Sequence, residues 1–149
     1  MEGFKLVGKK LMMQTCNKNG QAAIDCGSLW QAFMEDEIIK KIPNKISNEI
    51  VAVYYDYESD EHGMYSFFIG CKVASETLKP EDLDELTIPV QKYQLETAKG
   101  QMPDCVANAW RKIWSTKINR QYGFDFEIYD QRSHDWANAE IDIYLSLTN

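Results

Sequence analysis

Hydrophobic and polar positions along the chain alternate in two periods, one typical of helices and one typical of strands. Apolar residues recur at helical spacing in two stretches, and we predict helices over residues 25–40 and 103–118. Stretches rich in valine, isoleucine and aromatic residues predict strands. These strands lie at residues 4–14, 50–57, 64–73, 87–97, 124–130 and 139–147.

The order of these elements is repeated once along the chain. Each half, residues 1–78 and residues 79–149, reads strand, helix, strand, strand. The polar segment 75–86 is predicted to connect the halves. We therefore predict an α+β fold for residues 1–149, with duplicated strand-helix-strand-strand modules in one domain, pseudo-two-fold symmetry and a central ligand cleft.

Aromatic residues recur at matching places in the two halves. Trp30 and Trp110 lie 80 residues apart in the predicted helices. Tyr55 and Tyr129 lie 74 residues apart in the strands that follow these helices. A shorter loop in the second half accounts for the difference, so we pair the two tyrosines as equivalent positions.

Successive side chains of a strand point to opposite faces of a sheet. In the strand 124–130 we expect the apolar set to pack beneath the helices: Phe124, Phe126 and Ile128. The other set then faces the cleft: Asp125, Glu127 and Tyr129. The same reasoning assigns to the cleft face Tyr65, Phe67 and Ile69 of one strand and Glu140, Asp142 and Tyr144 of another.

The predicted cleft is walled by aromatic rings, with carboxylates at one side. The candidate ligand-binding residues are Trp30, Tyr55, Phe67, Trp110, Tyr129, Trp136 and Tyr144. Such rings stack on flat molecules and attract cations, and a buried carboxylate pairs with positive charge. Glu127 stands out because it sits between Phe126 and Ile128, although surface exposure of this acid stays open. Each aromatic residue alone could also be an ordinary half-buried residue.

Composition narrows the function further. The chain carries a net charge of −7 and no basic run longer than two residues, which argues against direct nucleic-acid binding. No apolar stretch approaches the roughly 18–20 residues of a membrane span. The N-terminus lacks the layout of a signal peptide, and the four cysteines form no CxxC pair. We therefore expect reduced thiols and a cytoplasmic location.

Known catalytic signatures are not found in the sequence. There is no GxSxG, HExxH, glycine-rich phosphate loop or cysteine–histidine motif. The two histidines, His62 and His134, are predicted to lie on the surface rather than to bind metal. We expect no metal site and no cofactor.

Three segments carry a resemblance to a known family: the helix 107–114, the strand 124–129 and the closing strand 139–144. Together with the duplicated layout, they resemble the GyrI-like small-molecule-binding domains, which also serve as effector-binding domains of AraC-type and MerR-type transcription regulators. The resemblance implies an α+β fold of two modules with a central cleft. It also implies that Glu127 matches a glutamate that meets cationic, aromatic ligands in the regulators.

Two functions follow as hypotheses from this resemblance. The first is a stand-alone cytoplasmic protein that binds aromatic or cationic small molecules, xenobiotics among them. The alternative is a GyrI-like hydrolase that opens the cyclopropane of DNA-alkylating genotoxins. In that case Glu127 would position or deprotonate water, and Tyr65 or Tyr129 would donate a hydrogen bond to the drug carbonyl.

A protein partner is a third hypothesis. The sequence shows no DNA-binding module, so a separate regulator could read the bound ligand. Gyrase could bind the acidic surface, although the acidic run at 81–85 is more simply a solvated loop.

Overall fold

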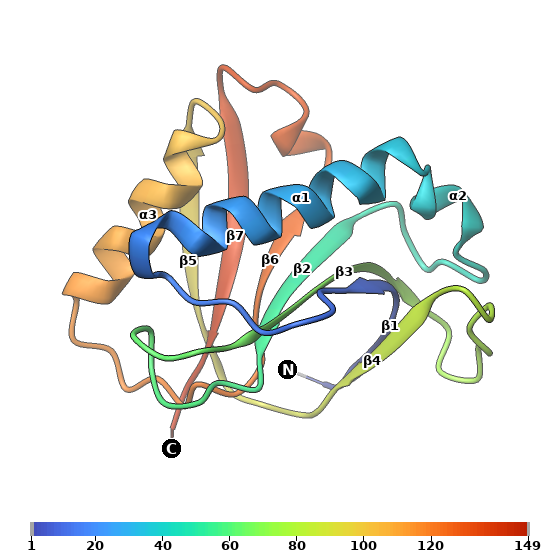
Figure 1. The fold of residues 1–149 in the computed structure, drawn as a ribbon, viewed down its shortest axis with the longest axis horizontal. Coiled ribbons are helices and arrows are strands. Elements are labelled where there is room, and N and C mark those ends of the chain that lie inside the picture. The colour runs from blue at the N-terminus through green and yellow to red at the C-terminus, as the bar shows by residue number, and fades with distance from the viewer. Residues whose placement is uncertain (1, 149) are drawn as a thin grey trace.

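The computed structural model describes residues 2–148; Met1 and Asn149, the ends of the predicted domain, lie outside the described residues. Seven strands form one antiparallel sheet, and α1 and α3 lie on the same face of it (Figure 1). The α+β class predicted from the sequence is confirmed. The strands are β1 (Phe4–Lys10), β2 (Ile50–Tyr55), β3 (Ser66–Val73), β4 (Asp84–Ile88), β5 (Tyr93–Gly100), β6 (Asp125–Tyr129) and β7 (Ala139–Ser146). The helices are α1 (Gln21–Glu35), α2 (Ile38–Lys41) and α3 (Asp104–Ser115), with 3-10 turns η1 (Lys18–Gly20) and η2 (Gln131–Ser133).

The order of strands in the sheet reflects the duplication. The order is β4-β1-β3-β2-β6-β7-β5. Apart from β4, it is symmetrical about the boundary between β2 and β6. In each half the strand after the helix lies at the centre, and the strand that opens the half lies furthest out. Helix α3 packs against β5 and β7 of the second half, and α1 packs against β3 of the first half.

The connection between the halves differs from the prediction. Residues 75–86 were expected to be a plain connection, followed by one strand over 87–97. The structure instead ends β4 at Ile88 and begins β5 at Tyr93, and β4 pairs with β1. Pro89 follows β4 directly, and a proline cannot donate a ladder hydrogen bond, so it separates the two strands.

The first predicted helix is also divided in two. It begins at Gln21 rather than near residue 25, and α1 ends at Glu35. Glu37 has a φ of 51°, in the left-handed region, so the helical hydrogen-bond pattern cannot continue through it. Within residues 2–148, neither α1 nor any other helix combines the length and the apolar character needed to cross a bilayer.

The register of the strands decides which side chains face the helices. Glu127 on β6 is directly opposite Ala52 on β2 and Ile143 on β7. Directly opposed residues share a face. Ile143 packs in a core with Ile113 of α3, so Glu127 points toward the helices. The expectation that Phe126 and Ile128 pack beneath the helices is therefore wrong, because they belong to a core on the other face.

The helix-free face buries a core of its own because the sheet curls around it. The Phe4 ring on β1 lies 5.4 Å from the Phe126 ring on β6, although two strands separate β1 from β6. In a flat sheet that separation is about 14 Å. Gly8 on β1 is directly opposite Gly70 on β3. Because a Cβ at Gly8 would meet the Ile69 carbonyl oxygen at 2.0 Å, this close approach of the two strands requires glycine. Both faces of the central strands are thus apolar.

Candidate ligand-binding site

Glu127 lies at the centre of the sheet, on the helix side, and only 1% of its surface is exposed. Three neutral groups donate hydrogen bonds to its carboxylate. Tyr54 Oη on β2 lies 2.9 Å from Oε2, and Trp110 Nε1 on α3 lies 2.6 Å from the same oxygen. Tyr129 Oη on β6 donates to Oε1 at 2.8 Å. Three separate elements therefore converge on one carboxylate.

The charge of Glu127 is not balanced by a cation. Among residues 2–148, no lysine, arginine or histidine lies within ion-pair distance of Glu127, whereas eight such contacts form elsewhere. Burial raises the pKa of Glu127, and the hydrogen bonds from Trp110, Tyr129 and Tyr54 oppose part of that rise. A buried carboxylate normally pairs with a cation, because neutral donors alone compensate poorly for lost hydration. An ionised Glu127 therefore has no counter-charge among the described residues.

Aromatic rings from both helices and three strands enclose this carboxylate. The Trp30 ring of α1 lies 4.9 Å from the Tyr129 ring, and the Trp110 ring of α3 lies 5.2 Å from the Tyr54 ring. Phe67 contacts the Tyr54 ring at 5.0 Å from below. The residue directly opposite Glu127 is Ala52, whose small side chain leaves the space above it to these rings.

Helix α1 also brings a cysteine to the site, which sequence reasoning missed. Burial, and after it the negative charge of Glu127, raise the pKa of the Cys26 thiol to about 12. The thiol therefore stays protonated at neutral pH and is not an activated nucleophile.

A second buried carboxylate, Asp125, lies two residues before Glu127 on the same face. It is fully buried, and Arg120 Nη2 donates to its Oδ2 at 2.8 Å. Tyr57 Oη donates to Oδ2 at 2.7 Å, and the backbone nitrogen and Oγ of Ser146 donate to Oδ1 at 2.7 and 2.8 Å. Asp125 was predicted to face the cleft, but its charge and its oxygens are satisfied within the protein.

Several of the predicted site residues come together in the structure. Around Glu127 the structure gathers Trp30, Tyr65, Phe67, Trp110 and Tyr129. Tyr65 stands slightly apart, because its hydroxyl donates to Asn17 Oδ1 at 2.7 Å rather than to Glu127. Its ring nevertheless lies 5.7 Å from the Tyr54 ring. Burial raises the pKa of the Tyr65 hydroxyl above its ordinary value.

Three other predicted residues do not join this cluster. Tyr55 stacks on Phe124 at 5.7 Å and Tyr144 stacks on Phe126 at 4.9 Å, both in the core of the helix-free face. Placing these two tyrosines in the cleft was wrong, because the register of β2 and β7 turns them away from Glu127. Trp136 lies in the loop before β7 and is 61% exposed, outside the ring cluster.

Tyr54 is the hydrogen-bond donor to Glu127 that the sequence pattern missed. The pairing of Tyr55 with Tyr129 as equivalent positions was wrong by one residue, since Tyr54 and Tyr129 share the helix face. Because the two tyrosines are adjacent and identical, no apolar–polar alternation indicates which of them faces the helices. Only the register with β6 shows which one reaches Glu127.

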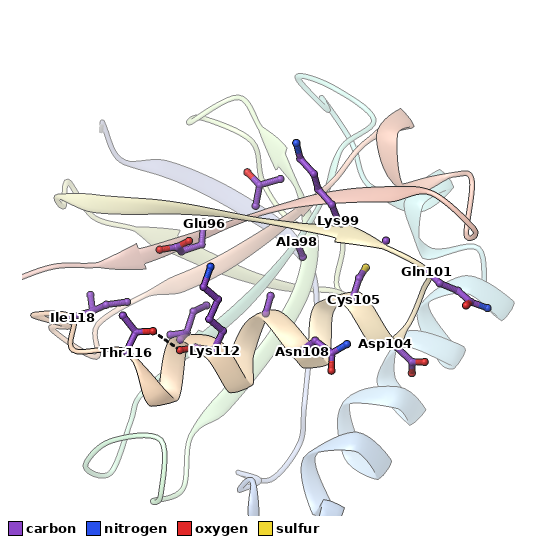
Figure 2. A pocket seen from close by; sticks show the side chains of 14 residues that line it. Glu96, Ala98, Lys99, Gln101, Asp104, Cys105, Asn108, Lys112, Thr116 and Ile118 are labelled. Carbon is purple, nitrogen blue, oxygen red and sulfur yellow. Dashed lines mark hydrogen bonds between the residues drawn. The ribbon is translucent and has the colours of Figure 1, made fainter.

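A separate surface groove lies between β5 and α3 (Figure 2). Its volume is about 510 Å³, and polar side chains such as Glu96, Asn108 and Lys112 line its walls. The thiol of Cys105 lies near its floor (Figure 2). None of the residues that donate to Glu127 lines this groove, so it is distinct from the enclosed cluster.

Comparison with known proteins identifies the family. A family model described as integron-associated effector binding protein, Cass2, matches residues 1–147. The chain belongs to the Cass2 family. This membership confirms the resemblance to effector-binding domains that the sequence segments indicated.

Solved structures share the fold of this Cass2 protein. An integron cassette protein from Vibrio cholerae superposes with a TM-score of 0.74 and 24% identity, over 99% of this chain and 92% of that one. The structure of SAV2435 bound to tetraphenylphosphonium gives a TM-score of 0.78 and 18% identity, over 100% and 91%. These likenesses confirm the duplicated α+β architecture.

Curated relatives carry names from transcriptional regulation. YobU of Bacillus subtilis, named for a role as a transcriptional regulator, is 28% identical over 124 residues, 80% of this chain and 78% of YobU. The transcriptional regulator BrlR of Pseudomonas aeruginosa is 29% identical over 130 residues. That match covers 81% of this chain but only 46% of BrlR, so the Cass2 chain spans less than half of that regulator.

Proposed function

We propose that this Cass2 protein binds an aromatic or lipophilic cation as a small-molecule effector, with Glu127 as the counter-charge. One observation carries the proposal: Glu127 is buried among aromatic rings, and the groups of residues 2–148 that donate to it are all neutral. Retaining a charged group in that position costs stability. A cationic ligand would supply the missing charge.

The surrounding rings favour the same class of ligand. The electron-rich faces of tryptophan and tyrosine attract cations, and their area provides apolar contact for aromatic groups. Trp30 of α1 contacts the ring of Tyr129, and Trp110 of α3 contacts the ring of Tyr54, the two tyrosines that donate to Glu127. Because Glu127 is covered, an entering ligand has to displace one of these rings. Helix-borne side chains can rotate without breaking the sheet that carries Glu127.

The relatives support the proposal. Tetraphenylphosphonium, the molecule bound in the SAV2435 structure, is a lipophilic cation with four aromatic rings. The names of YobU and BrlR favour an effector that acts in transcriptional regulation.

A hydrolase acting on strained cyclopropane rings is the second candidate. The observation in its favour is the raised pKa of Glu127, since a general base works best when its pKa lies near the working pH. In this reading Glu127 deprotonates water and a tyrosine hydroxyl, from Tyr129 or Tyr65, supports the developing charge on the ligand. The two candidates differ in whether the ligand is recovered unchanged.

Titration calorimetry with tetraphenylphosphonium tests the proposal on the wild type and on Glu127→Gln. We expect the affinity to fall about 10- to 100-fold in this variant, because a hydrogen bond or contact with a charged group contributes about 1.5–3 kcal/mol. The matched control is Glu140→Gln, which removes the same charge from a partly exposed glutamate. Equal affinities in all three proteins would contradict the proposal.

Mass spectrometry of a recovered ligand separates binding from hydrolysis. A cyclopropane-bearing aromatic alkylator incubated with the protein should be recovered intact if the site only binds. A ring-opened product that gains one water and disappears with Glu127→Gln would favour the hydrolase.

A further inference from the structure

Arg120 is a deeply buried cation that uses only part of its hydrogen-bonding capacity. Its side chain is 4% exposed, and Nη2 donates to Asp125 Oδ2 at 2.8 Å. Nε and Nη1 are buried and have no hydrogen-bond partner among residues 2–148. Leaving a buried donor unpaired costs about 1–3 kcal/mol. The two unpaired N–H donors of Arg120 can therefore donate to an acceptor atom of a bound ligand.

Two aromatic rings hold the guanidinium in position. Its Cζ lies 4.3 Å from the centre of the Tyr122 ring and 5.7 Å from the centre of the Trp110 ring. The same Trp110 donates from Nε1 to Glu127. One indole therefore contacts the arginine with its ring and the unpaired carboxylate with its N–H group, which places both charges at one aromatic cluster.

The two charges are held at neighbouring positions of one strand. Asp125, which pairs with Arg120, and Glu127 lie two residues apart on one face of β6. Two residues of a strand span about 7 Å. Glu127 and the ion pair of Arg120 with Asp125 therefore lie on the same face of β6, at neighbouring positions that one aromatic ligand can contact together.

We propose that the site is bipolar, and that its cognate ligand is an aromatic cation that also carries a carbonyl or carboxylate oxygen. The cationic part lies against Glu127, and the oxygen accepts hydrogen bonds from Nε or Nη1 of Arg120. This inference rests on the proposed function and adds the acceptor to it. Tetraphenylphosphonium has no such oxygen and would use the Glu127 end alone.

A matched pair of fluorescent dyes tests the acceptor. Tetramethylrosamine and tetramethylrhodamine methyl ester share the same cationic ring system, and only the second carries a carbonyl group. We expect the ester to bind the wild type about tenfold more tightly, as is typical of a hydrogen bond to a charged donor. The measurement is a fluorescence-anisotropy titration of each dye.

Arg120→Lys separates this role from a structural one. The lysine keeps a positive charge beside Asp125 but lacks the Nε and Nη1 donors. We expect the ratio of the ester affinity to the rosamine affinity to fall to about one in this variant. A purely structural role would weaken both dyes equally and leave the ratio unchanged.

The outcomes distinguish this inference from the proposed function. Equal binding of the two dyes to the wild type, or a ratio that survives Arg120→Lys, would overturn the bipolar site. If Arg120→Lys does not fold, the ratio of the two dye affinities for the wild type still tests the bipolar site. Absence of binding by both dyes, or rosamine binding that is unchanged by Glu127→Gln, would instead contradict the proposed function itself.

Discussion

Asp125 and Glu127 are two buried carboxylates on the same face of β6, and they differ in the charge of their hydrogen-bond partners. Asp125 has a guanidinium beside it and accepts from a tyrosine, a serine hydroxyl and a backbone nitrogen. Glu127 accepts from two tyrosines and a tryptophan, with no cation at hand among the described residues. The charge of Asp125 is balanced within the fold, whereas Glu127 has no counter-charge among the described residues.

Under the proposed function, the difference separates a structural group from a binding group. Removing one partner of a buried ion pair leaves the other charge uncompensated, so Asp125 is bound tightly into the stability of the fold. An unpaired buried carboxylate lowers stability, and the proposed function supplies a reason for retaining it. Burial fraction alone does not distinguish the two acids; the charge of their partners does.

The largest effect that this comparison predicts is on stability. Asp125→Asn should lower the free energy of unfolding by about 3–5 kcal/mol, because it leaves Arg120 buried without a counter-charge. Glu127→Gln should change it by no more than about 1 kcal/mol, since the amide oxygen still accepts from Tyr54 and Trp110 and the NH₂ group can donate to Tyr129. Urea unfolding followed by circular dichroism measures both.

A partly exposed ion pair provides the control for this experiment. Asp130 pairs with Arg132 at 3.0 Å near the surface, and Asp130→Asn should cost less than about 1 kcal/mol. Similar large losses for Asp125→Asn and Glu127→Gln would show that both carboxylates are structural, and the distinction between them would fail.

A smaller effect is expected from two neighbouring tyrosines. Tyr54→Phe removes one hydrogen bond to Glu127 and should weaken tetraphenylphosphonium binding about 2- to 10-fold, because the carboxylate loses part of its stabilisation. Tyr55→Phe alters the core of the opposite face and should leave the affinity unchanged. Titration calorimetry compares the two variants, and a larger loss from Tyr55→Phe would contradict the assigned register.

The sequence predicted the elements and the central acid of the site, but not which side of the sheet it faces. Hydrophobic periodicity and residue composition predicted the two main helices and six of the seven strands near their observed positions. Glu127 stood out as a carboxylate between two apolar residues. The rule that the apolar side of a strand faces the helices failed at Phe126, because the curled sheet buries both of its faces.

Other parts of the site depend on contacts that no local pattern records. Tyr54 and Tyr55 are adjacent residues of the same type, and only pairing with β6 separates them. Arg120 lies between α3 and β6 and is held there by a bridge to Leu147 and by Asp125. Its position depends on the bridge to Leu147 and on the burial of Asp125, and hydrophobic periodicity indicates neither.

The central claim is that the charge of Glu127 binds the ligand, and the pH dependence of tetraphenylphosphonium affinity tests it most directly. Burial raises the pKa of Glu127 above the ordinary 4.5, so the neutral form persists to higher pH than in an exposed glutamate. Tetraphenylphosphonium does not titrate. We therefore predict that affinity rises as pH increases through the native pKa of Glu127, and that Glu127→Gln gives a flat profile at lower affinity. Profiles of the same slope in both proteins would contradict the account.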